Sequence, residues 1–229
     1  MTTQTLTINI DATTLSALQG SGFRLYAFLP VTSSNKSGVP LVWARIDTLL
    51  QTTTISYDPT TITAYISTSP IAVNQAITVG TSNRVATGQT VNVASSGALN
   101  VTSGAPAGDI YFVNGASTSF TCGLAVYEVA ATPCCAFALY AGNSVTLAPL
   151  NAIFVMWATS SYNAAVYMAQ SLGPGLFVQF DGNLQRTVSY DISLGWSASG
   201  AAWATAVPPG ANLAQILILN PGQNQPLYY

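Results

Sequence analysis

Short segments in which apolar and polar residues alternate run through almost the whole chain, and this pattern constrains the fold more than any other feature. In residues 5–10, Leu6, Ile8 and Ile10 alternate with polar neighbours, as in a strand that is buried on one face. Turn residues such as Asp58-Pro59 and Asn114-Gly115 separate the segments. Many short strands at this spacing predict an all-β protein, a β-sandwich of the jelly-roll or immunoglobulin-like kind. The alternating segments include FRLYAFL, PLVWARI, TTTISYD, TITAYIS, QTVNVAS, DIYFVN, GLAVYEV, AFALYA, AIFVMWA, NAAVYMAQ, LFVQF, LQRTVSYDI and AQILILN.

One helix is predicted, directly after the first strand. Asp11 has the side chain of an N-cap, TTLSALQ follows it, and Gly20 is suited to the C-terminal end. The rest of the chain carries no comparable pair of start and stop signals.

Six identities at one offset of 114 residues suggest an internal duplication. FRLYA at 23–27 matches FALYA at 137–141, and the pairs Trp43-Ala44 and Trp157-Ala158 follow at equal distances. We therefore expect two related β units, 1–117 and 118–229, which could also pack as one continuous domain. The repeated Tyr and Trp residues are expected to anchor each core, with ligand-stacking platforms as the alternative.

Charge is scarce, and this excludes several kinds of partner. Charged residues make up 5% of the 229 residues, and the net charge is −2. Five isolated basic residues cannot neutralise a run of phosphates, so nucleic acid is excluded as a partner. A weakly charged surface also lacks the repulsion that keeps molecules apart, so we expect a homo-oligomer or a larger assembly.

The apolar runs and the cysteines give limited information on the cellular compartment of the protein. No basic segment followed by an apolar core opens the chain, and no apolar run approaches the length of a membrane helix, so a soluble chain without a signal peptide is expected. The three cysteines, Cys122, Cys134 and Cys135, are expected to be reduced and structural, with Cys122 on the far arm of a hairpin around residues 130–133. Reduced cysteines suggest a cytoplasmic origin.

The chain lacks the residues that most enzymes use. It has no histidine, which removes the most frequent general base and the imidazole metal ligands. Two of the seven carboxylates could in principle form a glycosidase pair, yet no motif selects any two of them. No phosphate-binding loop, zinc pattern or calcium loop is present. We predict a non-enzymatic protein without a cofactor or a metal.

The segment FDGNLQRTVSYD, residues 180–191, concentrates charge and is the candidate site. Asp-Gly between alternating segments predicts a hairpin in which Gly182 has a positive φ. Arg186 lies on the more apolar face of its strand and needs a carboxylate partner, for which Asp181 and Glu128 are candidates. Aromatic and planar polar side chains suit a neutral glycan, so lectin-like carbohydrate binding is the first hypothesis. Its ligand-binding residues are Asp181, Asn183, Arg186, Tyr190, Asp191, Trp196 and Trp203. The alternative is that Tyr190 and Trp196 belong to the core.

Two other functions stay open. Uncharged Thr- and Ser-rich strands could pair edge to edge in a self-assembling filament, shell or crystalline array. The alternating segment 82–104 is typical either of an ordinary edge hairpin or of the amphipathic hairpin of a membrane-active, pore-forming protein.

A resemblance covers mainly the first half of the chain. It rests on Gly22–Tyr26, Val42-Trp43, Ile55–Thr60 and Val85–Val91, taken in that order. With these segments the chain resembles a loose group of uncharacterised microbial β-rich proteins. The resemblance implies no activity.

Overall fold

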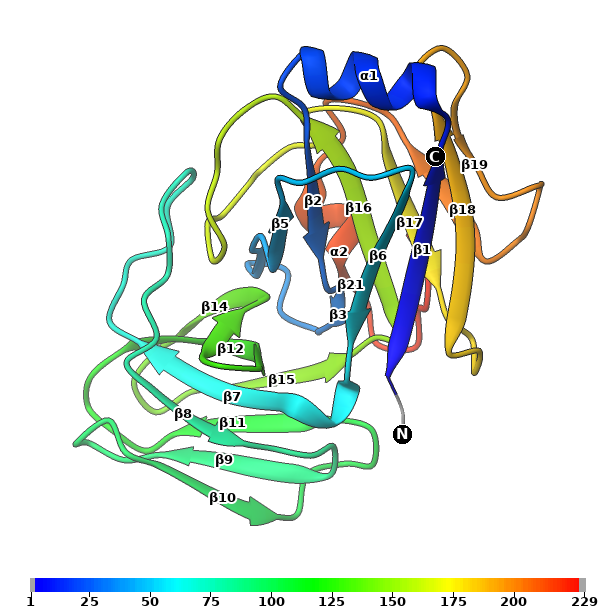
Figure 1. Ribbon diagram of the computed structural model, residues 1–229. Helices are drawn as coiled ribbons and strands as arrows, with labels where there is room; N and C mark the ends of the chain where they lie inside the picture. Colours follow the sequence, from blue (N-terminus) through cyan, green and yellow to red (C-terminus); the bar gives the residue numbers. More distant parts are fainter. Residues whose placement is uncertain (1–2, 227–229) are drawn as a thin grey trace.

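A computed structural model describes residues 3–226 of the chain. The prediction of an all-β protein is confirmed, since 47% of the residues lie in strands and 8% in helices. Within the described residues, no helix is long and apolar enough to cross a membrane. Figure 1 shows the strands gathered into two lobes, with β6 running from one lobe into the other, where it is followed by β7.

The first lobe consists of two sheets that pack over one core. Sheet I contains, in spatial order, β19 (Gly195–Ser197), β18 (Gln185–Asp191), β1 (Gln4–Ile10) and β6 (Thr52–Tyr57). Sheet II contains β20 (Ala204–Val207), β17 (Gly175–Gln179), β16 (Ala152–Ala158), β2 (Arg24–Phe28) and β5 (Ala44–Ile46). Alternate residues of β1 (Leu6, Ile8 and Ile10) face sheet II and meet Leu25, Val155 and Trp157 in the shared core.

Sheet II is buried on both faces. Phe28, Phe154 and Phe177 point away from sheet I into a second apolar cluster, which includes Leu213 and Leu217. Every residue of β16 is therefore buried, which explains why AIFVMWA is a continuous apolar run rather than an alternating one.

The second lobe also pairs two sheets. Sheet III contains β10 (Leu99–Ser103), β9 (Gln89–Val93), β11 (Ile110–Asn114), β15 (Ser144–Pro149), β3 (Val31–Thr32) and β21 (Ile218–Leu219). Sheet IV contains β4 (Val39–Pro40), β14 (Cys135–Leu139), β12 (Phe120–Tyr127), β7 (Ile62–Ser67) and β8 (Thr81–Arg84), and β13 (Ala131–Pro133) pairs with β12. Their shared core includes Val91, Phe112, Leu124 and Phe137.

The segment 82–104 is part of this second lobe. It supplies β9 and β10, which form an antiparallel hairpin, together with most of β8. Val91, Val93 and Leu99 are buried, and β10 lies at the edge of sheet III. The alternation in this segment thus places apolar residues in the protein core.

The two predicted units, 1–117 and 118–229, are interleaved, because each sheet takes strands from both halves of the chain. In sheet I, β1 pairs in parallel with β18, and in sheet II, β2 pairs with β16. The matched residues also differ in environment, since Tyr26 is fully buried whereas Tyr140 is 61% exposed. The duplication and the specific sandwich type stay predictions.

The helix predicted after Asp11 is present as α1 (Ala12–Gly20). The Oδ1 of Asp11 accepts hydrogen bonds from the backbone N–H of Thr13, at 2.7 Å, and of Thr14, at 2.9 Å, which is the geometry of an N-cap. A short 3-10 helix, η1 (Pro59–Thr61), precedes β7.

Two predicted strands are wrong. NAAVYMAQ, residues 163–170, forms only isolated bridges, through Val166, Tyr167 and Gln170. A second helix contradicts the predicted strand AQILILN. Residues 213–217 form α2 (Leu213–Leu217), and only Ile218–Leu219 pair as a strand, with β3. The Asn212 side chain caps this helix, and Leu213, Ile216 and Leu217 share the helical spacing that places them on one buried face. A run of Leu and Ile is compatible with the spacing of a helix and with that of a strand. The Asn212 cap therefore favours the helix here.

Candidate functional site

The turn at Asp181-Gly182 does not connect a hairpin, contrary to the prediction. Both residues have a positive φ, 45° and 78°, as expected for a tight turn. However, β17 before the turn belongs to sheet II and β18 after it to sheet I. Each of these strands already has neighbours on both sides, so the turn carries the chain from one layer of the lobe to the other.

Arg186 lies on the inward face of β18, as predicted, but its expected carboxylate partner is wrong. The guanidinium donates from Nε to the Gln179 carbonyl, at 3.0 Å, and from Nη2 to the Phe180 carbonyl, at 2.9 Å. It also lies 4.6 Å from the centre of the Trp203 ring. Among the described residues, the ion pairs join Asp47 to Arg24 and to Arg45, and none involves Arg186.

Tyr190 is buried in the core of the first lobe, and Trp196 is partly buried against that core, in agreement with the alternative prediction for these two residues. The Trp196 ring stacks on Trp157 with centroids 5.8 Å apart, and its Nε1 donates to the Pro174 carbonyl. Tyr190 packs against both indoles, and burial raises the pKa of its phenol. Asp191 accepts hydrogen bonds from the backbone N–H groups of the following turn, residues 193–194.

The seven predicted residues therefore do not converge on one site. Asn183 lies before the start of β18 and Asp191 is its last residue. The seven residues of this strand, about 20 Å of extended chain, therefore separate them. Of the seven, Asn183 alone lines a cavity that residues of both lobes enclose.

That cavity lies between the two lobes and has a volume of about 650 Å³. We call it the junction cavity. The first lobe contributes Gln4, Leu29 and Tyr57, and the second contributes Ile62 and Leu124. Cys134, which lies between β13 and β14, also lines the cavity and packs with the core of the first lobe. Its wall is mostly apolar, and no charged residue lines it. A concave, largely apolar space with a few polar groups is the usual form of a small-molecule site.

One wall of the junction cavity carries a chain of polar side chains. Gln4 and Tyr57 face each other across the β1–β6 ladder, and the Tyr57 hydroxyl donates to the Gln4 Oε1 at 2.6 Å. The Gln4 Nε2 in turn donates to the Asn151 Oδ1 at 3.2 Å. Burial, together with nearby Cys134, raises the pKa of Tyr57, so this phenol stays a neutral donor.

The three cysteines are buried and free. Burial raises the pKa of the Cys134 thiol, which lines the junction cavity, well above its usual value. A protonated, enclosed thiol is a weak nucleophile. The predicted hairpin around residues 130–133 is formed by β12 and β13, and Cys122 lies on β12 as predicted.

Within residues 3–226, no group of three or more Cys, Asp or Glu side chains is close enough to hold a metal ion. The junction cavity can therefore hold a ligand through its shape, its apolar surface and its hydrogen-bonding side chains.

Comparisons with known proteins add no family to this picture. No family model, no curated protein and no solved structure matches the chain.

Proposed function

We propose that the protein binds a neutral, mainly apolar small molecule in the junction cavity and performs no chemistry on it. The observation that carries the proposal is the cavity itself, about 650 Å³ of largely apolar space between the lobes, with one polar wall. This volume is within the range of about 300–1,000 Å³ that is typical of ligand pockets.

The wall of the cavity sets the charge of the ligand. Gln4, Tyr57, Asn151, Asn183 and two threonines supply most of its side-chain polarity, and none of these carries a charge. A charged ligand would lose its hydration without gaining a counter-ion, which costs far more than a neutral ligand loses. A neutral molecule is therefore favoured.

The polar chain sets the orientation. Asn151 uses its Oδ1 to accept from Gln4, and its Nδ2 has no hydrogen-bond partner among the described residues. Asn151 is exposed whereas Gln4 is buried, so the free Nδ2 lies at the solvent end of this chain. A hydroxyl or carbonyl head on an apolar body would accept from Asn151 and bury its body against the aliphatic wall.

A neutral dye tests the proposal directly. N-phenyl-1-naphthylamine fluoresces when it enters an apolar site, so its emission should rise and saturate with wild-type protein. Ala86 lines the cavity with an exposed side chain, and Ala86→Phe should fill that space and weaken binding at least about tenfold, a loss of about 1.4 kcal/mol. Ala72→Phe, an exposed alanine outside the cavity, is the matched control. Equal dye binding by all three proteins would refute the site.

Self-assembly is the second candidate function, and the edge of sheet III favours it. The edge strand β10, with sequence LNVTS, has no charged residue and no proline, which are the usual protections of an edge. Light scattering at increasing protein concentration should then detect growing particles, which Asn100→Lys on β10 should prevent. A monomer at every concentration would eliminate this candidate. Glycan binding by the seven residues around Arg186 stays a prediction.

A further inference from the structure

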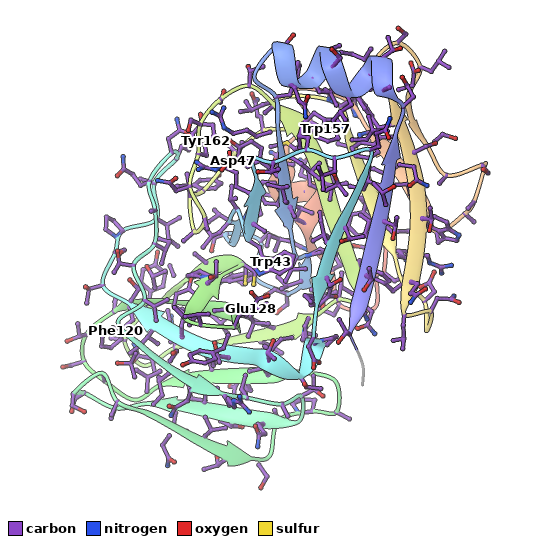
Figure 2. All side chains as sticks on the ribbon, in the orientation of Figure 1. Trp43, Asp47, Phe120, Glu128, Trp157 and Tyr162 are labelled. Atoms are coloured by element: carbon purple, nitrogen blue, oxygen red, sulfur yellow. The ribbon has the colours of Figure 1, made fainter. Side chains whose placement is uncertain are left out.

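A second, smaller pocket opens at the side of the first lobe, where it faces the second. Strands β5 and β6 are the edge strands of sheets II and I, and Trp43 precedes β5. Opposite them lies the β12–β13 turn, which carries Glu128. Figure 2 shows Trp43 and Glu128 at this junction of the lobes. The pocket has a volume of about 270 Å³, and we call it the Trp43 pocket.

Polar groups without partners gather at this pocket. Glu128 is exposed and makes no ion pair or hydrogen bond with the described residues. The hydroxyls of Thr54 and Thr132, which also line the pocket, form no hydrogen bond within the described residues either.

The indole of Trp43 adds a free donor. Its Nε1–H has no hydrogen-bond partner among the described residues. If this nitrogen were also fully buried it would be a buried, unsatisfied donor, but among the described residues the Nε1 of Trp157 is the only side-chain nitrogen or oxygen of that kind. The Nε1 of Trp43 is therefore not fully enclosed by protein. Ile46 and Ala44 supply apolar surface beside it.

The donor and acceptor pattern identifies the class of ligand. A carboxylate only accepts hydrogen bonds, an indole only donates them, and a threonine hydroxyl does both. An ammonium group could donate to Glu128 but could not accept from Trp43. A sugar hydroxyl donates and accepts, so neighbouring hydroxyls on one ring can satisfy Glu128, Trp43 and the threonines together.

We propose that the Trp43 pocket binds one residue of a neutral, hydroxyl-rich glycan through Glu128, Trp43, Thr54 and Thr132. Its volume is below the usual range of about 300–1,000 Å³ for drug-sized ligands, which favours a single sugar ring. The Trp43 pocket and the junction cavity share only Val126 among their lining residues, so this proposal does not depend on the proposed function.

The test observes Trp43 itself. Protein labelled with 5-fluorotryptophan gives separate fluorine NMR signals, and Trp43→Phe identifies the signal of Trp43. Titration with methyl glycosides of glucose, galactose, mannose and N-acetylglucosamine should shift this signal with at least one sugar and leave Trp203 unchanged. Glu128→Ala should weaken that sugar about tenfold or more, because a hydrogen bond to a charged group is worth about 1.5–3 kcal/mol. Thr54→Val should weaken it less, and Thr102→Val on β10 is the matched control.

The alternative ligands are part of the same titration. A shift with tetramethylammonium and none with the sugars would overturn the proposal in favour of a cation site. A sugar response that Glu128→Ala leaves unchanged would place the sugar elsewhere and also overturn it. No response to any probe, in protein that still binds N-phenyl-1-naphthylamine, would refute the Trp43 pocket and leave the junction cavity in place.

Discussion

Replacing Arg186 tests whether a buried-face arginine can be held without a carboxylate. In the structure its partners are the carbonyls of Gln179 and Phe180 and the face of Trp203. Arg186→Ala removes all three contacts, although the Phe180 carbonyl still accepts from the backbone N–H of Asn183. Arg186→Lys keeps the charge but replaces a planar fork by a single ammonium, which cannot make both hydrogen bonds and stack on the ring.

The magnitude follows from these contacts. Hydrogen bonds to a charged group contribute about 1.5–3 kcal/mol each, and partial exposure of Arg186 places them at the low end. A cation–π contact at a partly exposed site adds about 0.5–1 kcal/mol. We expect Arg186→Ala to lower the free energy of unfolding by about 2–4 kcal/mol, and Arg186→Lys by about half of that.

Urea unfolding followed by tryptophan fluorescence measures this loss, because all four tryptophans pack in or against the core of the first lobe. Arg84→Ala is the control, since the Arg84 side chain is exposed and makes no ion pair or hydrogen bond with the described residues; it should change stability by less than about 0.5 kcal/mol. Double-mutant cycles should give a coupling of about 0.5–1 kcal/mol between Arg186 and Trp203, and none with Asp181. A larger coupling with Asp181 than with Trp203 would refute the reasoning.

Three further changes have defined outcomes. Gly123→Ala should cost about 3 kcal/mol or more, because its Cβ would collide with the Cys135 carbonyl, whereas Gly20→Ala, in open space at the end of α1, should be neutral or stabilising in the same urea assay. Tyr57→Phe should cost about 1–3 kcal/mol by leaving the Gln4 oxygen without its donor, and Gln4→Leu in that background should recover part of the loss. The unfolding free energy should fall as the pH rises above about 9, by at most about 1.4 kcal/mol per pH unit and thiol, because the unfolded thiols ionise there while burial holds the folded pKa of Cys135 at about 12. Burial raises the pKa of two more thiols, those of Cys122 and Cys134, and a urea midpoint that stays constant from pH 7 to pH 10 would contradict this reasoning.

Local features of the fold could be predicted because they depend on neighbours in the chain. Alternation in β1 and β18 correctly assigned Ile8 and Val188 to the buried face. Asp11 marked the start of α1 because its side chain bonds backbone N–H groups only two and three residues away. In both cases the interaction that decides the structure lies within one turn or one strand.

Strand pairing could not be predicted in the same way. The Asp181-Gly182 turn has the dihedral angles of a hairpin, yet β18 pairs in parallel with β1, at the other end of the chain. A turn fixes the direction of the chain over a few residues, whereas the choice of a neighbouring strand depends on which apolar faces need covering. Arg186 was misassigned for a related reason, since a guanidinium can be satisfied by carbonyls that no sequence pattern marks.

The junction cavity has one residue that the sequence pattern could identify and several partners that it could not. Gln4 has the same parity as Leu6, Ile8 and Ile10, so the alternation that placed those residues in the core also placed an amide there. A buried amide needs partners, and the partners are Tyr57 and Asn151, 53 and 147 residues away. Inward polar residues on strands otherwise lined by Leu and Ile are thus the positions where a sequence of this kind can point to a site. Their partners become apparent only when the sheets are assembled, because the lobes that enclose the cavity are each built from distant parts of the chain.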